Sequence, residues 1–381
     1  MSFKPVLKPM IADDRPDTPR LSLLALLPTL QGGGSERVMT TLLRHLDRTR
    51  FAVSLAVVDG RAAAMAHDLP TDLAWLDLRC PRVLRAVPAI WRLIRSQRPR
   101  VVLSTLGHLN LMLALIKPML PRGIRLVGRE SNTVSEQLRT EPHSAAWRLG
   151  YRLFYRRLDL VICQSQAMRD DLCRSFAFPP SRCVIIPNPL DLLRIRQLAS
   201  ESVPDAAPRT GARLLAVGRL SHQKGFEVLL HALARCSAHD LHLDILGQGP
   251  EEAKLRRLIV ELGLGERVRL HGFQSNPYAW MRRADALVLS SRYEGLPNVV
   301  LESLACGTPV VTTPVPSALE IVSGLSQCVV ADGFGADELS RALQQWRDSS
   351  RERVPEDAVA RYDVETVTRR YEEALERAAG V

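Results

Sequence analysis

The sequence predicts two α/β domains in tandem, each built on a parallel sheet with helices on both faces. Short, continuously apolar runs alternate with helical patterns along most of the chain, and a Pro-rich, weakly apolar stretch at residues 201–211 divides the series. Continuously apolar strands are typical of parallel sheets that are buried on both faces. Such sheets bind ligands at the carboxyl ends of their strands, so we expect a central cleft where the domains face each other.

The first series of elements begins at Leu21, after a polar, Pro-rich start of the chain. Its apolar runs predict strands at residues 21–27, 52–58, 101–106, 124–127 and 158–163, with helical patterns clearest at 35–46, 86–98 and 168–176. The second series predicts strands at residues 213–217, 242–246, 268–271, 286–289 and 309–312. We therefore expect a polar extension (1–20), a first Rossmann-like domain (21–190), a linker (191–211), a second Rossmann-like domain (212–358) and a C-terminal helix (359–381) that packs back on the first domain.

Composition excludes several classes of protein. The 381 residues are 46% hydrophobic and 24% charged, which is typical of globular proteins. The seven cysteines form no C-x-x-C pair and no Cys/His cluster, which predicts reduced core thiols and no metal site. We see no signal-peptide pattern, and the most apolar stretch, residues 109–116, is far shorter than the roughly 20 residues that span a bilayer. We expect a cytoplasmic protein.

Charge is distributed unevenly between the two halves of the chain. Residues 1–200 hold 30 Lys and Arg against 16 Asp and Glu, whereas residues 201–381 hold 21 against 25. The segment from Trp147 to Arg157 is both basic and aromatic on a helical pattern. It suits an interfacial anchor or, equally, a core helix whose arginines reach solvent. The basic half predicts a fixed anionic partner surface.

The strongest motif holds two carboxylates eight residues apart, Glu294 and Glu302, in Ser290-Ser-Arg-Tyr-Glu-Gly-Leu-Pro-Asn-Val-Val-Leu-Glu302. Glu294 lies in a predicted strand-to-helix loop, and Glu302 lies in the helix that follows. Amides at the start of that helix can bind a phosphate, which predicts donor contacts from Leu296, Pro297, Asn298 and Val299. Glu302 can accept hydrogen bonds from ribose hydroxyls and Glu294 from sugar hydroxyls. From spacing alone, two solvated carboxylates are an equally good interpretation.

This segment resembles the E-x7-E motif of glycosyltransferase family 4, a family of retaining enzymes with the GT-B fold. The resemblance extends through Gly272-Phe273-Gln274 and Val217-Gly218-Arg219-Leu-Ser-His-Gln-Lys224-Gly225 to nearly all of the second domain. It implies that Arg219 and Lys224 grip the donor diphosphate, with Gly218 and Phe273 beside them; without it, two surface charges would be the better interpretation. Two cations near the leaving phosphates can replace a divalent metal, and we find no Asp-x-Asp pair in a suitable loop. We predict metal-independent chemistry without a cofactor.

The first domain contributes a glycine-rich turn, Gly32-Gly33-Gly34-Ser-Glu-Arg37, after its first strand. Its backbone can approach an anion closely, although such turns occur in many α/β folds. Beside the other motifs it resembles the family's G-G-x-E-R loop, which implies that Gly33 and Gly34 face the donor phosphates and the acceptor.

One position departs from the family pattern. Many members carry a His at the end of the fifth strand of the first domain, where it contacts the transferred sugar, whereas this chain has Arg129 and Glu130. We expect one of them to make the sugar contact. His108 follows another strand and is a second candidate for the acceptor or sugar, although a structural histidine is as good an interpretation.

The resemblance implies a retaining hexosyl- or N-acetylhexosaminyltransferase that uses a nucleotide diphosphate-sugar, with a UDP-sugar favoured and GDP-mannose as the other candidate. It implies a lipid-linked, polyprenyl-diphosphate glycan as acceptor in bacterial polysaccharide synthesis. Together with the basic half, this predicts a peripheral protein on the cytoplasmic face of the inner membrane. Two alternatives are a sugar-nucleotide epimerase on the same fold and, from the charge alone, a nucleic-acid-binding protein. No aromatic-basic binding motif supports the latter.

Overall fold

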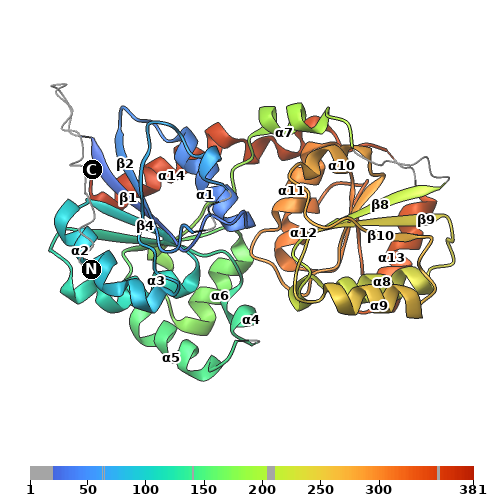
Figure 1. The fold of residues 1–381 in the computed structure, drawn as a ribbon, viewed down its shortest axis with the longest axis horizontal. Helices are drawn as coiled ribbons and strands as arrows, with labels where there is room; N and C mark the ends of the chain where they lie inside the picture. Colours follow the sequence, from blue (N-terminus) through green and yellow to red (C-terminus); the bar gives the residue numbers. More distant parts are fainter. Residues whose placement is uncertain (1–19, 62, 64, 140, 204–210, 350–351) are drawn as a thin grey trace.

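A computed structural model describes residues 20–61, 63, 65–139, 141–203, 211–349 and 352–381. It confirms the predicted fold class, because the chain forms two α/β domains, each with an all-parallel sheet (Figure 1). The expected polar extension lies outside the described residues except for Arg20, as does part of the expected linker, residues 204–210.

The first domain holds a sheet of seven strands in the order β3-β2-β1-β4-β5-β6-β7. Its elements are β1 (Leu21–Leu27), α1 (Gly34–His45), β2 (Phe51–Val57), β3 (Ala74–Asp77), α2 (Val83–Gln97), β4 (Val101–Thr105), α3 (Gly107–Ile116), β5 (Arg125–Arg129), α4 (Val134–Arg139), α5 (Ser144–Phe154), β6 (Leu160–Cys163), α6 (Gln166–Phe176) and β7 (Cys183–Ile185). Strand β3 was not predicted because this edge strand is largely exposed, and β7 because three residues give no periodic signal.

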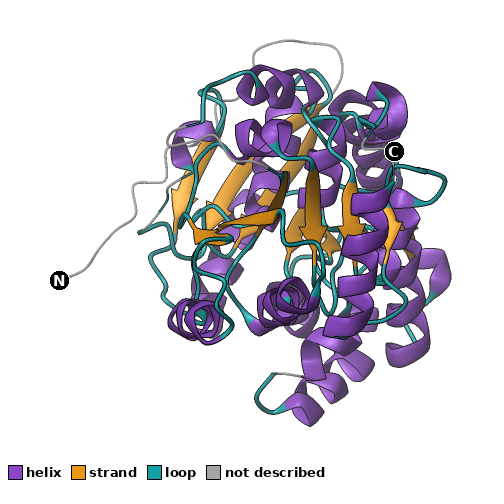
Figure 2. Cartoon of the chain, turned by 90° about the vertical axis from the view of Figure 1, so that its right-hand side faces the viewer, coloured by secondary structure: helices purple, strands orange, loops and turns teal. Residues whose placement is uncertain are grey.

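The second domain holds six strands in the order β10-β9-β8-β11-β12-β13. Its elements are α7 (Leu192–Ala199), β8 (Ala212–Val217), α8 (Phe226–Arg235), β9 (Leu241–Leu246), α9 (Glu252–Glu261), β10 (Val268–Leu270), α10 (Pro277–Arg283), β11 (Ala286–Leu289), α11 (Asn298–Ala305), β12 (Val310–Thr312), α12 (Pro316–Val322), β13 (Val329–Val330) and α13 (Ala336–Asp348). Figure 2 looks onto this domain, where helices flank the strands on both sides. Helix α7 lies inside the expected linker, but its Ile195 and Ala199 join the core of the second domain.

Each sheet is buried on both faces, which explains why its strands are continuously apolar. In the first domain α2, α3, α5 and α6 cover one face, and α1 together with the C-terminal helix covers the other. In the second domain α8, α9 and α13 cover one face, and α7, α10, α11 and α12 cover the other. Because helices cover both faces, only the loops at the ends of the strands are accessible to ligands.

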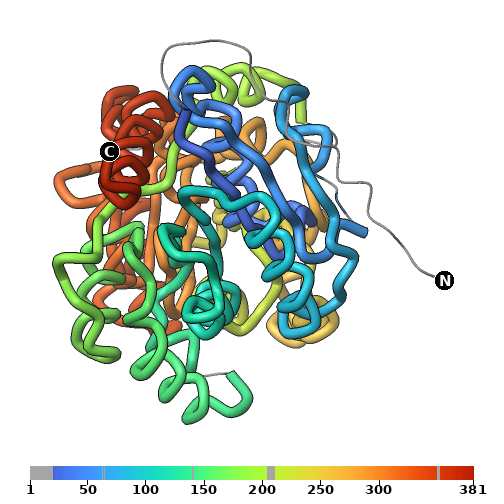
Figure 3. The backbone as a smooth tube through the Cα atoms, turned by 90° about the vertical axis from the view of Figure 1, so that its left-hand side faces the viewer, coloured from blue at the N-terminus to red at the C-terminus, as the bar shows by residue number. Residues whose placement is uncertain are grey.

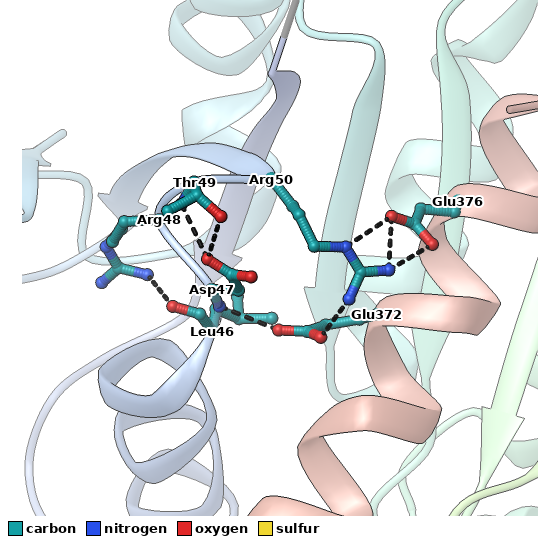
Figure 4. A network of polar contacts seen from close by, with 7 residues as sticks. All are labelled: Leu46, Asp47, Arg48, Thr49, Arg50, Glu372 and Glu376. Atoms are coloured by element: carbon teal, nitrogen blue, oxygen red, sulfur yellow. Dashed lines mark hydrogen bonds and ion pairs between the residues drawn. The ribbon is translucent and has the colours of Figure 1, made fainter. Parts of the chain in front are cut away.

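The last helix, α14 (Val364–Ala379), returns to the first domain and packs against its sheet and α1 (Figure 3). Val367, Tyr371 and Leu375 are fully buried there. Two ion pairs reinforce the contact, because Arg50 lies 2.8 Å from Glu372 and 2.6 Å from Glu376 (Figure 4). Glu372 also accepts a hydrogen bond of 2.8 Å from the Asp47 amide.

Two segments cross between the domains side by side. Leu190 donates a 2.8 Å backbone hydrogen bond to Tyr362, and Val364 donates a 2.9 Å hydrogen bond back to Leu190. The paired crossings hold the domains together at one end of their interface. No helix within the described ranges is long and apolar enough to cross a bilayer.

Candidate active site

A cleft of about 230 Å³ separates the two domains and is lined by both. The first domain contributes Arg37 from α1, and the second contributes Phe273, Asn298 and Glu302. The glycine-rich loop before α1 and the turn before α11 meet here. The carboxyl ends of the two sheets therefore form one site, as the fold predicts.

The amino ends of α1 and α11 approach each other across this cleft. Asn298, the first residue of α11, donates a 3.4 Å hydrogen bond from its side-chain amide to the carbonyl of Gly34, the first residue of α1. A Cβ at Gly34 would lie only 3.3 Å from that amide nitrogen, so glycine permits the close approach. Two helix amino ends, each with a positive partial charge, favour an anion at this junction.

The amides at the two helix starts differ in availability. In α11 the first hydrogen bond along the helix is donated by Val300 to the carbonyl of Pro297, so the amides of Asn298 and Val299 precede the helical ladder. In the glycine-rich loop, by contrast, the amides of Gly32 and Gly33 donate 2.8 and 2.7 Å hydrogen bonds to the Glu36 carboxylate. Glu36 thus fixes the loop and leaves α11 as the better source of phosphate contacts.

The turn before α11 is locked onto the first domain. A Cβ at Gly295 would lie 2.3 Å from the Ser131 carbonyl, and Ser165 donates a 3.2 Å hydrogen bond to the Gly295 carbonyl. The next residue, Leu296, is buried, and Pro297 caps the helix with extended backbone angles. This packing positions the start of α11 against the first domain.

Glu302 lies in the cleft and is already paired. Its Oε1 atom is 3.2 Å from a guanidinium nitrogen of Arg37 and accepts a 3.4 Å hydrogen bond from the Tyr278 hydroxyl. The charge of Glu302 raises the pKa of Arg37. The glycine-rich motif includes Arg37 but does not predict its pairing with Glu302, and no sequence motif marks Tyr278. The exposed ring of Phe273 lines the same cleft.

Lys224 and Glu294 form a second pair, outside the residues that line the cavity. The Lys224 ammonium lies 2.6 Å from Glu294 Oε1, which also accepts a 2.6 Å hydrogen bond from Ser291. Gly218 makes room for the lysine, because a Cβ there would lie 3.0 Å from Lys224 Cε. Arg219 is exposed on the same loop and has no polar partner in the parts of the chain that are described.

Arg129 is buried at the end of β5, with only 1% of its surface exposed. All its hydrogen-bond partners are neutral: Tyr371 at 3.1 Å, Ser35 at 3.1 Å, Thr105 at 3.2 Å, Ser131 at 3.3 Å and Asn188 at 2.5 Å. Asn188 in turn donates a 2.5 Å hydrogen bond to Asn298. The guanidinium is therefore held by the first domain and linked to the start of α11; in this arrangement it does not line the cleft.

Glu130 is buried next to Arg129 but belongs to a different cluster. Its carboxylate accepts hydrogen bonds from the Tyr155 hydroxyl and, at 3.3 Å, from the Asn110 amide. Burial raises the pKa of Glu130 to about 7. His108 lies nearby, at the second position of α3, and burial lowers its pKa. Neither residue lines the cleft, so their contact with sugar or acceptor stays a prediction.

A metal site is expected to be absent from the protein. In the described segments, no three His, Cys, Asp or Glu side chains converge in a way that would hold a metal ion. Whether the reaction needs a metal stays a prediction.

Comparisons with known proteins assign both domains. Residues 32–194 match the family model described as Glycosyltransferase Family 4, and residues 201–359 match the model described as Glycosyl transferases group 1. The chain is 31% identical over 303 residues to N-acetylgalactosamine-N,N'-diacetylbacillosaminyl-diphospho-undecaprenol 4-alpha-N-acetylgalactosaminyltransferase of Campylobacter jejuni, covering 75% of this chain and 78% of that protein. It is also 24% identical to the amylovoran biosynthesis glycosyltransferase AmsD of Erwinia amylovora, covering 82% and 84% of the two chains.

Solved structures share the same fold. The structure of Anabaena HepE in complex with UDP and glucose superposes with a TM-score of 0.73 at 18% identity, covering 94% of this chain and all of that one. WaaG, a glycosyltransferase involved in lipopolysaccharide biosynthesis, gives a TM-score of 0.73 at 17% identity with the same coverage. The chain therefore belongs to glycosyltransferase family 4 and has the GT-B fold of that family.

Proposed function

We propose that this glycosyltransferase moves a hexosyl or N-acetylhexosaminyl group, with retention of configuration, from a nucleotide diphosphate-sugar to a polyprenyl-diphosphate-linked glycan in bacterial polysaccharide synthesis. A UDP-sugar is the favoured donor, with GDP-mannose as the other candidate. The names of the relatives support this choice: the Campylobacter enzyme acts on a diphospho-undecaprenol glycan, AmsD serves amylovoran biosynthesis, and HepE binds UDP.

The observation that carries the proposal is the junction of the two helix amino ends, α1 and α11. The proposal adds that Arg219 and Lys224 reach the donor phosphates bound there. Negative charge grows on the leaving diphosphate as the sugar departs. A cation about 4 Å away contributes about 4 kcal/mol at an effective dielectric near 20. Two cations together with two helix ends can supply this stabilisation without a metal ion.

The donor fits the remaining groups as follows. The Glu302 carboxylate accepts hydrogen bonds from the ribose hydroxyls, and these replace its present contacts with Arg37 and Tyr278. Glu294 binds hydroxyls of the sugar, and Lys224 shifts from Glu294 toward the phosphates. The bond from the anomeric carbon to the phosphate oxygen breaks, the acceptor oxygen bonds the same face of that carbon, and its proton goes to the leaving phosphate oxygen.

Arg129 acts in this scheme as a positioning residue rather than as a sugar contact. Its guanidinium donates a hydrogen bond to Ser35 in the first turn of α1. It donates another to Asn188, which in turn donates one to Asn298 at the start of α11. A buried cation surrounded by neutral groups raises the local potential for an anion. These hydrogen bonds also fix the position of the start of α1 relative to the start of α11 across the domain interface.

Location follows from the acceptor. A polyprenyl-diphosphate keeps its lipid in the bilayer, so we propose that the basic first domain approaches the cytoplasmic face of the inner membrane as a peripheral protein. The helix α5 of the expected anchor packs Tyr151 into the core while Leu149 and Leu153 stay exposed. The exposed leucines support the proposal that this helix contacts the membrane, while its buried face belongs to the core of the domain.

Thermal unfolding in the presence of UDP-, GDP- and ADP-sugars tests the donor. A ligand at about 100 times its Kd stabilises the protein by about 2.7 kcal/mol, so the true donor class should stand out. Product analysis with a lipid-linked acceptor then gives the anomeric configuration. Conversion of the donor to its epimer in the absence of acceptor would instead favour the epimerase, and no stabilisation by any nucleotide sugar would overturn the proposal.

A further inference from the structure

A second cavity, of about 570 Å³, opens on the first domain away from the interdomain cleft. It lies at the amino ends of the strands: Arg125 begins β5, Asp159 precedes β6 and Arg182 precedes β7. The candidate active site uses the opposite, carboxyl ends. This basic pocket is therefore separate from the machinery described above.

The pocket is lined by six cations and one acid. The cations are Lys117, Arg122, Arg125, Arg156, Arg157 and Arg182, and the acid is Asp159. Asp159 is shared by Lys117 at 2.6 Å and Arg125 at 3.4 Å. Six like charges around one cavity repel one another, and Asp159 can offset only part of that repulsion. The charge complement of the pocket is an anion with more than one negative charge or several hydrogen-bond acceptors, such as a phosphate group.

Three of these cations are held in place by the fold. The Lys117 ammonium donates a 2.6 Å hydrogen bond to the Arg157 carbonyl. Arg157 donates a 3.4 Å hydrogen bond to the Leu115 carbonyl and lies over the ring of Phe154, and Arg182 donates a 3.1 Å hydrogen bond to the Leu158 carbonyl and lies over Phe178. A guanidinium fixed by one hydrogen bond keeps further N–H donors for a ligand, and fixing it in advance lowers the entropy lost on binding.

Two further arginines of the basic pocket are free to reach a ligand. Arg122 and Arg156 are exposed and have no polar partner within the described ranges of the chain. Exposed apolar side chains come from the elements beside the pocket, with 40% exposure for Leu115, 66% for Met119 and 57% for Leu153. A free phosphate in water makes no favourable contact with apolar side chains. A phospholipid presents a phosphate and acyl chains together, so it can contact both the cations and the apolar side chains.

We propose that the basic pocket binds the phosphate of an anionic membrane lipid, while Leu115, Met119 and Leu153 enter the acyl region beside it. This inference rests on the peripheral location in the proposed function. The proposed function involves only a general attraction between the basic first domain and an anionic membrane. The basic pocket would add a specific site for one lipid headgroup at the amino ends of the strands. A bound headgroup would fix how the first domain sits on the membrane and hence the direction in which the cleft faces.

The test compares flotation of the full chain with vesicles of pure phosphatidylcholine and with vesicles that contain phosphatidylglycerol. The variant Arg122→Glu/Arg156→Glu removes two free donors of the pocket. A matched control, Arg61→Glu/Arg79→Glu, makes the same change in net charge at exposed positions of β-sheet loops near the other edge of the same domain. We expect the pocket variant to lose roughly tenfold or more in partition to the anionic vesicles, and the control to lose little.

Two outcomes would overturn the headgroup site. Equal losses in the two variants would show that net charge alone drives binding, and displacement from vesicles by millimolar inorganic phosphate would show that the pocket prefers a free anion. Turnover of a water-soluble, short-chain acceptor separates this inference from the proposed function. That turnover should be the same in both variants and in the parent chain, and it should be absent in all three when the proposed function itself is wrong.

Discussion

The two domains each hold a cation in a different environment: Lys224 is partly buried and Arg129 is fully buried. In the second domain Lys224 is neutralised by Glu294 at 2.6 Å, and Ser291 supports the same carboxylate. In the first domain Arg129 is more deeply buried, and its hydrogen-bond partners are all neutral. A buried charge that is hydrogen-bonded only to neutral groups costs folding free energy, so we expect an anionic ligand in the cleft to interact favourably with Arg129. Under the proposed function, Lys224 would leave Glu294 for the donor phosphates, whereas Arg129 would keep its present hydrogen bonds.

Replacing Arg129 should have the largest effect of the substitutions considered, and it should fall on the stability of the protein. The variant Arg129→Met should lower the free energy of unfolding by about 4 kcal/mol, because it leaves buried oxygens of Asn188 and Tyr371 without their donor. Urea unfolding measures this change.

A functional measurement separates the charge of Arg129 from its structural role. UDP should bind Arg129→Gln more weakly than Arg129→Lys, since only the lysine keeps the positive charge, while uridine should bind both equally. Equal affinity of UDP for the two variants would remove Arg129 from the donor site and leave it a structural residue.

The variant Lys224→Ala should have the next largest effect, and it should fall on turnover. The interaction of Lys224 with the phosphates strengthens as the leaving group gains charge, so kcat should fall roughly 100-fold to 1,000-fold, or about 3–4 kcal/mol, with a smaller change in KM. Arg219→Ala should act in the same direction. Steady-state kinetics with a saturating acceptor measure both, and unchanged kcat in the two variants would refute the assignment.

Glu130 sharpens the comparison, because it is the buried acid next to Arg129 in the chain. The charge of Arg129 lowers the pKa of Glu130, but burial raises it by more. Burial raises its pKa to about 7 in the folded state from an ordinary 4.5. The folded protein therefore binds this proton more tightly than the unfolded chain, and its contribution to stability is present below pH 4.5 and is lost as the pH rises through 7. Over pH 5 to 8 this amounts to a loss on the order of 2–3 kcal/mol in the free energy of unfolding.

Urea unfolding at several pH values checks this prediction against Glu130→Gln, which keeps the size of the side chain and cannot ionise. The difference in unfolding free energy between the variant and the parent chain should grow from pH 5 to pH 8. A constant difference would mean that Glu130 titrates normally.

The sequence predicted the sheets well because their strands are buried on both faces and read as uninterrupted apolar runs. It also predicted that the glycine-rich loop and the E-x7-E segment would face one cleft, since these segments follow the carboxyl ends of the parallel strands β1 and β11. It did not predict the partners of these groups. Tyr278 meets Glu302 only through the packing of α10 on α11, and Arg129 meets Asn188 and Tyr371 across 59 and 242 residues of chain. Such contacts depend on tertiary structure and leave no local pattern.

The smallest expected effect is that of removing divalent metal ions, and it tests whether the two domains together replace a metal. A nucleotide diphosphate-sugar usually needs positive charge near its leaving phosphates, and here Arg219, Lys224, the helix ends and the buried charge of Arg129 are all candidates to supply it. Turnover should therefore change by no more than about twofold when EDTA is present, and added Mn²⁺ or Mg²⁺ should not restore turnover in Lys224→Ala. A strict requirement for either ion in the parent chain would mean that these cations do not suffice. Rescue of Lys224→Ala by a metal ion would show instead that the lysine acts only as a replaceable charge.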